Sequence, residues 1–334
     1  MKPRDVAELI KTAVKNLDMP AIHLWGPPGV GKSQVCRQVT KEEGVGFVDM
    51  RLSMMDPSDI KGLPFPENGK TKWLPPSEFP TEGRGMLLLD EINLAPPLVQ
   101  ASAYQLVYDR RVGEYIMPNG WIIIAAGNKA GHGANTFKMA APLRNRFIHI
   151  DFEYNIDDWR EWAIKNNIAT EVIEFVSYRP DLLFDFKPDR QDNAFPTPRS
   201  WEFVSKILRN SSNIKPDLRH HIIIGTVGEA AAIEFKSYLT LKEELPNIEE
   251  ILAGKDHMAK QFDVACAVVT ALVVRAAPNQ FERLLKYSTK IDSKEVAVLM
   301  VKLMLNKDKQ AVLNAPSWKA VANDYFDLMT WQAT

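Results

Sequence analysis

One short segment constrains this chain more than any other. Gly26–Ser33 reads GPPGVGKS and lies between the apolar run Ala21–Trp25 and the helical pattern Ser33–Glu43. It fits the pattern G-x-x-x-x-G-K-[ST], whose glycines let backbone N–H groups converge on an anion at a helix N-terminus. We expect Lys32 to bridge two phosphates and the Ser33 hydroxyl to coordinate Mg²⁺. The candidate nucleotide-binding residues are therefore Gly26, Pro27, Pro28, Gly29, Val30, Gly31, Lys32, Ser33 and Gln34.

The apolar pattern of the first half predicts an α/β fold. Short buried-strand patterns alternate with helical ones, which is typical of a mainly parallel sheet covered by helices on both faces. The expected strands are Ala21–Trp25, Val45–Leu52, Met86–Leu89, Trp121–Ala126 and Phe147–Phe152. The expected helices of this half are Pro3–Leu17, Ser33–Glu43 and Pro97–Tyr108.

After about residue 155 the pattern becomes helical. We predict an α/β nucleotide-binding domain over 1–155 with a proline-rich insertion at about 54–80, a helical domain over 156–290 and a helical extension over 291–334. The expected helices are Ile156–Asn166, Ala169–Tyr178, Ser200–Arg209, Ile222–Leu239, Gln261–Val274 and Lys294–Leu305.

Polar residues follow two of the predicted strands. Asp90 and Glu91 come directly after the apolar run Met86–Leu89, at the strand end where open α/β sheets bind ligands. Asp90 is a candidate magnesium ligand, and Glu91 is a candidate base for the attacking water. Asn128 follows the next such strand and could hold that water, although Gly-Asn is also a common turn.

Three arginines are candidates for stabilising transition-state charge. Arg144 and Arg146 stand in PLRNRF just before the last predicted strand, where one of them could reach the nucleotide of a neighbouring subunit. A surface arginine pair forming weak ion pairs is the alternative. Arg199 begins a predicted helix after a proline-rich loop and could equally be a solvent-facing residue of the first turn.

Together these motifs resemble those of AAA+ ATPases, and more narrowly those of the MoxR branch with its midasin and dynein relatives. The resemblance rests on GPPGVGKS, LLLDEINLAPPLV, AAGN and PLRNRF, all within residues 20–150. Met55–Gly62 (MDPSDIKG) resembles the start of this clade's insertion in helix 2, and Thr197–Arg199 (TPR) resembles a second sensor. The resemblance implies an AAA+ P-loop core followed by an α-helical lid.

The resemblance also implies roles and partners. Asp90 corresponds to the metal ligand, Glu91 to the catalytic base, Asn128 to the first sensor, Arg199 to the second, and Arg146 to the trans arginine finger. Arg144 stays open as the alternative finger. The family implies an ATP- and Mg²⁺-dependent hydrolase in homohexameric rings that remodels a protein partner, often one with a von Willebrand factor A domain.

Composition narrows the classes of partner and cellular location that this protein can have. Lys and Arg total 41 against 42 for Asp and Glu, so a net charge of −1 does not favour nucleic acid as the main partner. Cys36 and Cys266 fit neither a metal knuckle nor a secreted disulfide framework. The N-terminal residues lack a signal-peptide core, and no apolar run approaches the roughly 20 residues of a membrane span. We therefore expect a cytoplasmic protein without a membrane partner.

Two other functions remain open. A nucleic-acid motor of the same clade, such as a McrB-like GTPase, would be stimulated by DNA or prefer GTP. Basic and aromatic residues of the insertion could grip nucleic acid, although a pore-facing insertion explains them equally well; they are Lys61, Lys70, Lys72, Phe65 and Trp73. A slow nucleotide-gated adaptor would bind ATP and assemble but turn over too slowly to do work.

Overall fold

The computed structural model of the protein describes residues 1–129, 137–190, 192–211, 213–243 and 245–330. The chain forms two compact units. The first comprises Met1–Asn155 with Phe186–Gln191, and the second comprises Ile156–Asp185 with Asp192–Thr334.

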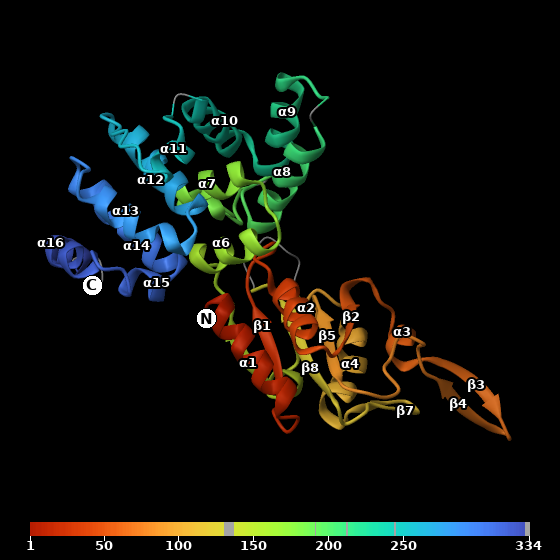
Figure 1. The fold of residues 1–334 in the computed structure, drawn as a ribbon. Helices are drawn as coiled ribbons and strands as arrows, with labels where there is room; N and C mark the ends of the chain where they lie inside the picture. Colours follow the sequence, from red (N-terminus) through yellow and green to blue (C-terminus); the bar gives the residue numbers. More distant parts are fainter. Residues whose placement is uncertain (130–136, 191, 212, 244, 331–334) are drawn as a thin grey trace. The chain divides into compact units, whose positions relative to one another are not determined.

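A parallel five-stranded sheet forms the centre of the first unit, as predicted (Figure 1). Its strand order is β2-β5-β8-β1-β9. The strands are β1 (Ala21–Trp25), β2 (Gly46–Arg51), β5 (Gly85–Asp90), β8 (Trp121–Gly127) and β9 (Phe147–Asp151). Strands β5 and β8 are buried along their whole length, which is why both read as continuous apolar runs.

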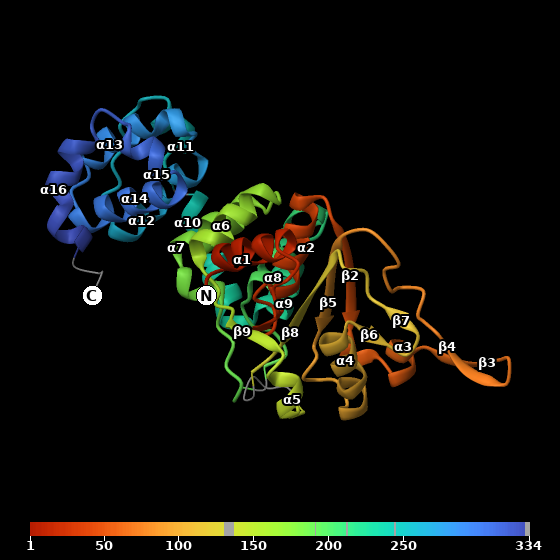
Figure 2. The same cartoon turned by 90° about the horizontal axis from the view of Figure 1, so that it is seen from below.

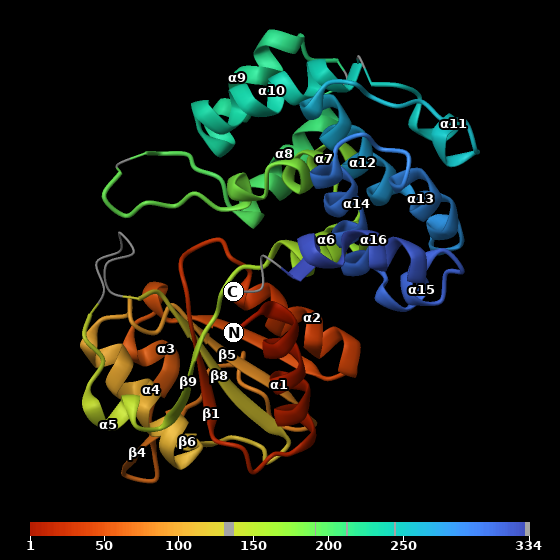
Figure 3. The same ribbon diagram turned by 90° about the vertical axis from the view of Figure 1, so that its left-hand side faces the viewer.

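Helices cover both faces of this sheet (Figure 3). They are α1 (Pro3–Lys15), α2 (Lys32–Glu43), α4 (Pro97–Asp109) and the short α5 (Ala141–Arg144). Side chains alternate between faces along a strand. Thus Leu87 and Leu89 of β5 share one cluster with Val99 and Leu106 of α4, while Met86 and Leu88 point to the opposite face.

The expected insertion at 54–80 contains regular structure. A 3₁₀ turn (Leu52–Met54) leads into α3 (Pro57–Lys61), which is followed by an antiparallel hairpin of β3 (Leu63–Glu67) and β4 (Lys70–Leu74). This hairpin extends away from the central sheet (Figures 1 and 2). A second hairpin, β6 (Arg111–Val112) with β7 (Tyr115–Ile116), follows α4, and its Gly113 lies against Trp73 of β4.

The second unit is helical. Its α-helices are α6 (Ile156–Lys165), α7 (Thr170–Tyr178), α8 (Pro198–Asn210), α9 (Pro216–Val227), α10 (Glu229–Glu243), α11 (Ile248–Leu252), α12 (Phe262–Arg275), α13 (Phe281–Ser288), α14 (Lys294–Lys307), α15 (Lys309–Leu313) and α16 (Trp318–Thr330). Two 3₁₀ turns, Pro180–Leu183 and Pro278–Gln280, complete it. No helix in the described part of the chain is both long and apolar enough to cross a membrane.

The expectation of one helix over Ile222–Leu239 is wrong. Gly228 divides this stretch into α9 and α10 and has a φ of 84°, in the left-handed region that favours glycine. A Cβ at this position would lie 2.8 Å from the carbonyl oxygen of Ala194. The apolar period continues through the break, so periodicity alone did not reveal it.

Two hydrophobic clusters build the helical unit. One contains Trp159, Phe175, Trp201 and Phe235, and the other runs from Ile248 to Tyr325. Residues on both sides of position 290 belong to the second cluster, so the expected start of the extension falls inside one core.

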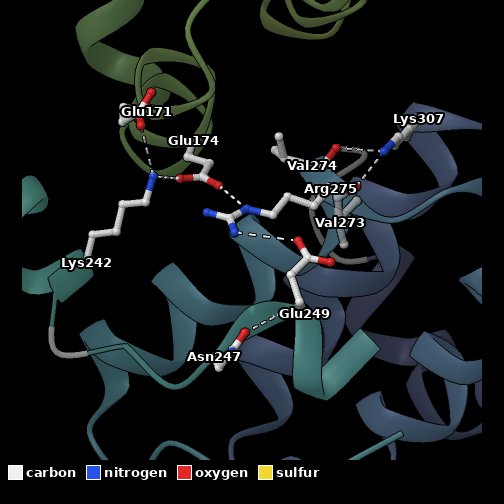
Figure 4. A network of polar contacts seen from close by, with 9 residues as sticks. All are labelled: Glu171, Glu174, Lys242, Asn247, Glu249, Val273, Val274, Arg275 and Lys307. Atoms are coloured by element: carbon white, nitrogen blue, oxygen red, sulfur yellow. Dashed lines mark hydrogen bonds and ion pairs between the residues drawn. The ribbon is translucent and has the colours of Figure 1, made fainter. Parts of the chain in front are cut away.

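A buried polar network joins helices of this unit (Figure 4). The fully buried carboxylate of Glu174 on α7 accepts a hydrogen bond from Arg275 of α12 at 2.8 Å and pairs with Lys242 of α10 at 2.8 Å. Lys307 donates to the carbonyls of Val273, Val274 and Ala276 at the end of α12. These bonds satisfy carbonyls that a helix C-terminus leaves without partners.

Candidate functional site

The site forms where three neighbouring strands end. Strands β5, β8 and β1 are adjacent and parallel, so their carboxyl ends lie at one edge of the sheet. Asp90 ends β5, Asn128 follows β8, and Gly26 follows β1. The register of the sheet therefore brings together residues that are far apart in the chain.

The loop after β1 is shaped to receive an anion. Gly29 and Gly31 have φ values of 78° and 105°, which only glycine adopts without strain. Gly31 is the N-cap of α2, and no side chain of the described residues caps this helix. The first N–H groups of α2 are therefore available to an anion, and the helix dipole favours negative charge there. Val30 of this loop is buried, whereas Gln34 is exposed on the first turn of α2.

Lys32 is held inside this loop. Its Nζ donates to the carbonyl oxygens of Gly26 at 2.7 Å and Pro27 at 2.9 Å, and to Oδ1 of Asn128 at 3.2 Å. The side chain is almost fully buried. The ammonium group is thus fixed between the loop and the end of β8, where a bound phosphate would meet it.

Ser33 and Asp90 form a pair of oxygen ligands beside Lys32. The Ser33 hydroxyl donates to Oδ2 of Asp90 at 2.7 Å, and the buried carboxylate also accepts the N–H of Glu91 through Oδ1 at 3.0 Å. In the described residues, no cluster of three or more His, Cys, Asp or Glu side chains could bind a metal ion. A hydroxyl with one carboxylate nevertheless fits Mg²⁺, which keeps several waters and takes further oxygens from substrate phosphates.

Glu91 is held in an unusual backbone conformation. Its φ of 57° lies in the left-handed region, which costs energy for a side chain with a Cβ. The hydroxyl of Ser53, in the turn after β2, donates a short hydrogen bond to the Glu91 carboxylate. A charged acceptor makes this bond stronger than a neutral one. Ser53 therefore fixes the direction of the Glu91 side chain.

Asn93 fixes the backbone of Asn128. Its side-chain amide donates to the Asn128 carbonyl at 2.5 Å and accepts the Asn128 N–H at 3.2 Å. A Cβ at Gly127 would lie 2.5 Å from Oδ1 of Asn93 and 2.9 Å from Nε2 of His23. The loop after β5 and the end of β8 are thus locked together at the position that we expected to hold the lytic water.

His23 of β1 lies close to Gly127, the last residue of β8. Its ring is fully buried, and neither ring nitrogen has a hydrogen-bond partner among the described residues. Burial lowers its pKa to about 3, with smaller contributions from His149 and the positive charge of Lys32. His23 is therefore neutral near pH 7.

The two candidate finger residues differ in their surroundings. Arg144 ends α5 with an exposed side chain, while the guanidinium of Arg146 lies 3.8 Å from the ring centre of Tyr108 on α4. Arg199 is exposed on the first turn of α8 in the helical unit. The structure thus brings together Lys32, Ser33, Asp90 and Asn128, while the proposed roles of the three arginines stay predictions.

Sequence reasoning missed two residues of the site. Ser53 is distant in sequence from Glu91 and belongs to a 3₁₀ turn that no apolar period announces. Asn93 stands inside the motif that contains Asp90 and Glu91, and a buried asparagine between apolar neighbours could have drawn attention to it.

Comparisons with known proteins agree with this fold. Residues 21–147 match the family described as AAA domain, dynein-related subfamily. RuvB of Parabacteroides distasonis, a Holliday junction branch migration complex subunit, is 27% identical over 139 residues, covering 39% of this chain and 36% of that protein. The chain thus aligns with about a third of that relative's length.

Two solved structures are similar at lower identity. A RuvB mutant of Thermotoga maritima has a TM-score of 0.42 and 16% identity, with 80% of this chain and 81% of that chain covered. NtrX of Brucella abortus in complex with ADP has a TM-score of 0.41 and 13% identity, with 97% of this chain and 68% of that chain covered.

Proposed function

We propose that this chain, an AAA+ P-loop fold with a dynein-related AAA domain at residues 21–147, is an ATP hydrolase that works as a ring on a protein partner. The observation that carries the proposal is the convergence of Lys32, Ser33, Asp90 and Asn128 through hydrogen bonds at one edge of the sheet. Positive charge, metal-type oxygen ligands and a polar amide are the groups that phosphoryl transfer needs.

The residues divide the work of binding and hydrolysis. The glycine loop and the uncapped start of α2 hold the phosphates, and Lys32 supplies a fixed positive charge beside them. Ser33 and Asp90 would hold Mg²⁺, which when bound would neutralise charge developing on the phosphate oxygens. Glu91, oriented by Ser53, accepts a proton from the attacking water. Asn128, oriented by Asn93, holds that water in line.

The site is completed by a neighbouring subunit in this proposal. Arg146 reaches the nucleotide of the next subunit, with Arg144 as the alternative, and Arg199 keeps its proposed role as the second sensor of the nucleotide. In a homohexamer, the Arg146 of each subunit acts on the nucleotide of its neighbour. Bound ATP then adds contacts across the interface and shifts the equilibrium towards the ring by mass action. We propose MoxR-type remodelling of a protein with a von Willebrand factor A domain as the work of the ring.

Nucleotide binding and hydrolysis measured on three variants test the proposal. Lys32→Ala should abolish ATP binding, because the loop loses its fixed cation. Glu91→Gln should bind ATP normally and lower kcat by roughly 10²–10⁴, the usual scale for a general base. Glu8→Gln makes the same chemical change on the exposed face of α1 and should behave like the wild type.

Two outcomes would contradict this division of roles. An equal loss of ATP affinity in Lys32→Ala and Glu91→Gln would show that Glu91 acts in binding. Unchanged hydrolysis in Glu91→Gln would remove it from the chemistry.

A nucleic-acid motor is the second candidate, because the matched RuvB is named for branch migration of Holliday junctions. Two observations argue against assigning branch migration to this chain. Its net charge is −1, and the alignment covers only about a third of that RuvB. Hydrolysis measured with and without branched DNA separates the candidates. Stimulation by DNA, or a preference for GTP, favours the motor.

A further inference from the structure

We propose that Tyr108 positions Arg146 for delivery to the neighbouring subunit, so that the finger is ordered before the ring forms. This inference rests on the proposed function, in which Arg146 completes a neighbour's site. Tyr108 lies outside the nucleotide site, and its contact with Arg146 raises the rate of hydrolysis.

Among the described residues, the guanidinium of Arg146 has one partner, the ring of Tyr108. Its guanidinium carbon lies 3.8 Å from the centre of the Tyr108 ring, well within cation–π distance. Its Nε is buried and has no hydrogen-bond partner among the described residues. The aromatic face of Tyr108 therefore holds the guanidinium of Arg146.

The aromatic ring is itself supported. Tyr108 stacks on Tyr104, one helical turn earlier on α4, with ring centres 5.7 Å apart and an angle of 8° between the planes. Tyr108 is 49% exposed, so Arg146 lies near the surface of its unit. Helix α5, just before Arg146, lies beside α4 in both views (Figures 2 and 3).

The base of the finger is also anchored, through His149 of β9. Trp25 Nε1 donates to Nδ1 of His149 at 2.8 Å, so Nε2 carries the proton and donates to the Arg144 carbonyl at 2.8 Å. The backbone N–H of Arg146 bonds to the carbonyl of the buried Leu143 at 3.1 Å. Both ends of the finger are therefore fixed to the domain that carries the phosphate loop.

Fixing both ends reduces the entropy that the arginine loses when it enters a neighbour's site. An unrestrained arginine loses much rotamer freedom on binding, and a planar guanidinium that is already oriented loses less. Arg144 has an exposed side chain without such a ring contact among the described residues. This difference favours Arg146 over Arg144 as the finger.

The test compares Tyr108→Leu with Tyr108→Phe in the full-length protein. Tyr108→Leu removes the aromatic face and should lower kcat about five-fold with KM for ATP unchanged, on the scale of one exposed cation–π contact. Tyr108→Phe keeps the face and should retain wild-type kcat. Unchanged kcat in the leucine variant, or equal losses in both variants, would overturn the proposal.

Mixed rings show on which side of the interface Tyr108 acts. Glu91→Gln subunits serve as finger donors, and Arg146→Ala subunits serve as acceptors. Adding Tyr108→Leu to the donor should lower the recovered activity about five-fold, whereas adding it to the acceptor should change nothing. A loss that follows the acceptor would make Tyr108 merely structural and refute the proposal.

Failure of the proposed function has a different signature. Full hydrolysis by Arg146→Ala alone would remove Arg146 as the finger, whatever the Tyr108 variants do. If Arg146→Ala is inactive but Tyr108→Leu is not impaired, the proposed function survives and the positioning role of Tyr108 is excluded.

Discussion

Replacing His23 with leucine should make the α/β unit less sensitive to acid. His23 is fully buried in β1, and burial lowers its pKa in the folded protein to about 3, from about 6.5 for an exposed histidine. Leucine has a similar size and cannot take up a proton. The two proteins should therefore differ in how their free energy of unfolding changes with pH.

The sign and size follow from proton linkage. Between pH 6.5 and 3 the unfolded chain binds a proton at His23 and the folded chain does not, so stability falls as the pH falls. Each pH unit in this window costs about 1.4 kcal/mol, so lowering the pH from 7 to 5 should cost the wild type roughly 2 kcal/mol through His23. The loss is absent above the window and levels off below pH 3.

The assay should report on the α/β unit alone. Met50 and Met86 are fully buried there, so peroxide oxidises them when this unit unfolds, and mass spectrometry follows their oxidation along a urea series. His221→Leu, at an exposed position of the helical unit, is the matched control and should keep the wild-type loss. An equal loss of stability from pH 7 to 5 in wild type and His23→Leu would refute the reasoning.

Three further substitutions test the packing of each unit and one polar contact of the site. Gly127→Ala should lower the free energy of unfolding of the α/β unit by about 1–3 kcal/mol in urea titrations, because its Cβ would overlap the Asn93 amide. Gly225→Ala, inside α9 with no atom near its Cβ, should instead stabilise the helical unit by about 0.5–1 kcal/mol. Ser53→Ala should lower kcat about tenfold at unchanged ATP affinity in steady-state assays, because Glu91 loses a charge-assisted hydrogen bond. A loss of stability in Gly225→Ala, or wild-type kcat in Ser53→Ala, would contradict the corresponding prediction.

The central strands β5 and β8 were predictable because they are buried along their whole length. Gly85–Asp90 and Trp121–Gly127 carry no polar residue before their ends, so the apolar runs and the polar residues that follow mark each strand and its tip. The break at Gly228 was not predictable from periodicity, since it depends on a left-handed φ and a close approach to Ala194.

Contacts between segments far apart in the sequence were the other feature that the sequence did not predict. Ser53 forms a hydrogen bond with Glu91, and Arg146 makes a cation–π contact with Tyr108. Each contact joins two segments that lie far apart in the sequence, and sequence separation does not predict distance in space. Only the order of the strands and the placement of α4 bring these residues together.

Mixing two inactive subunits tests the central claim most directly. Arg146→Ala keeps Lys32 and Glu91, and Glu91→Gln keeps its own Arg146, so an interface that joins them has one intact site and one intact finger. With random mixing at equal ratio, about a quarter of the interfaces should be active if the sites are independent. We predict recovered ATP hydrolysis in the mixture and almost none in either variant alone. Full hydrolysis by Arg146→Ala alone would contradict an arginine supplied in trans at this position.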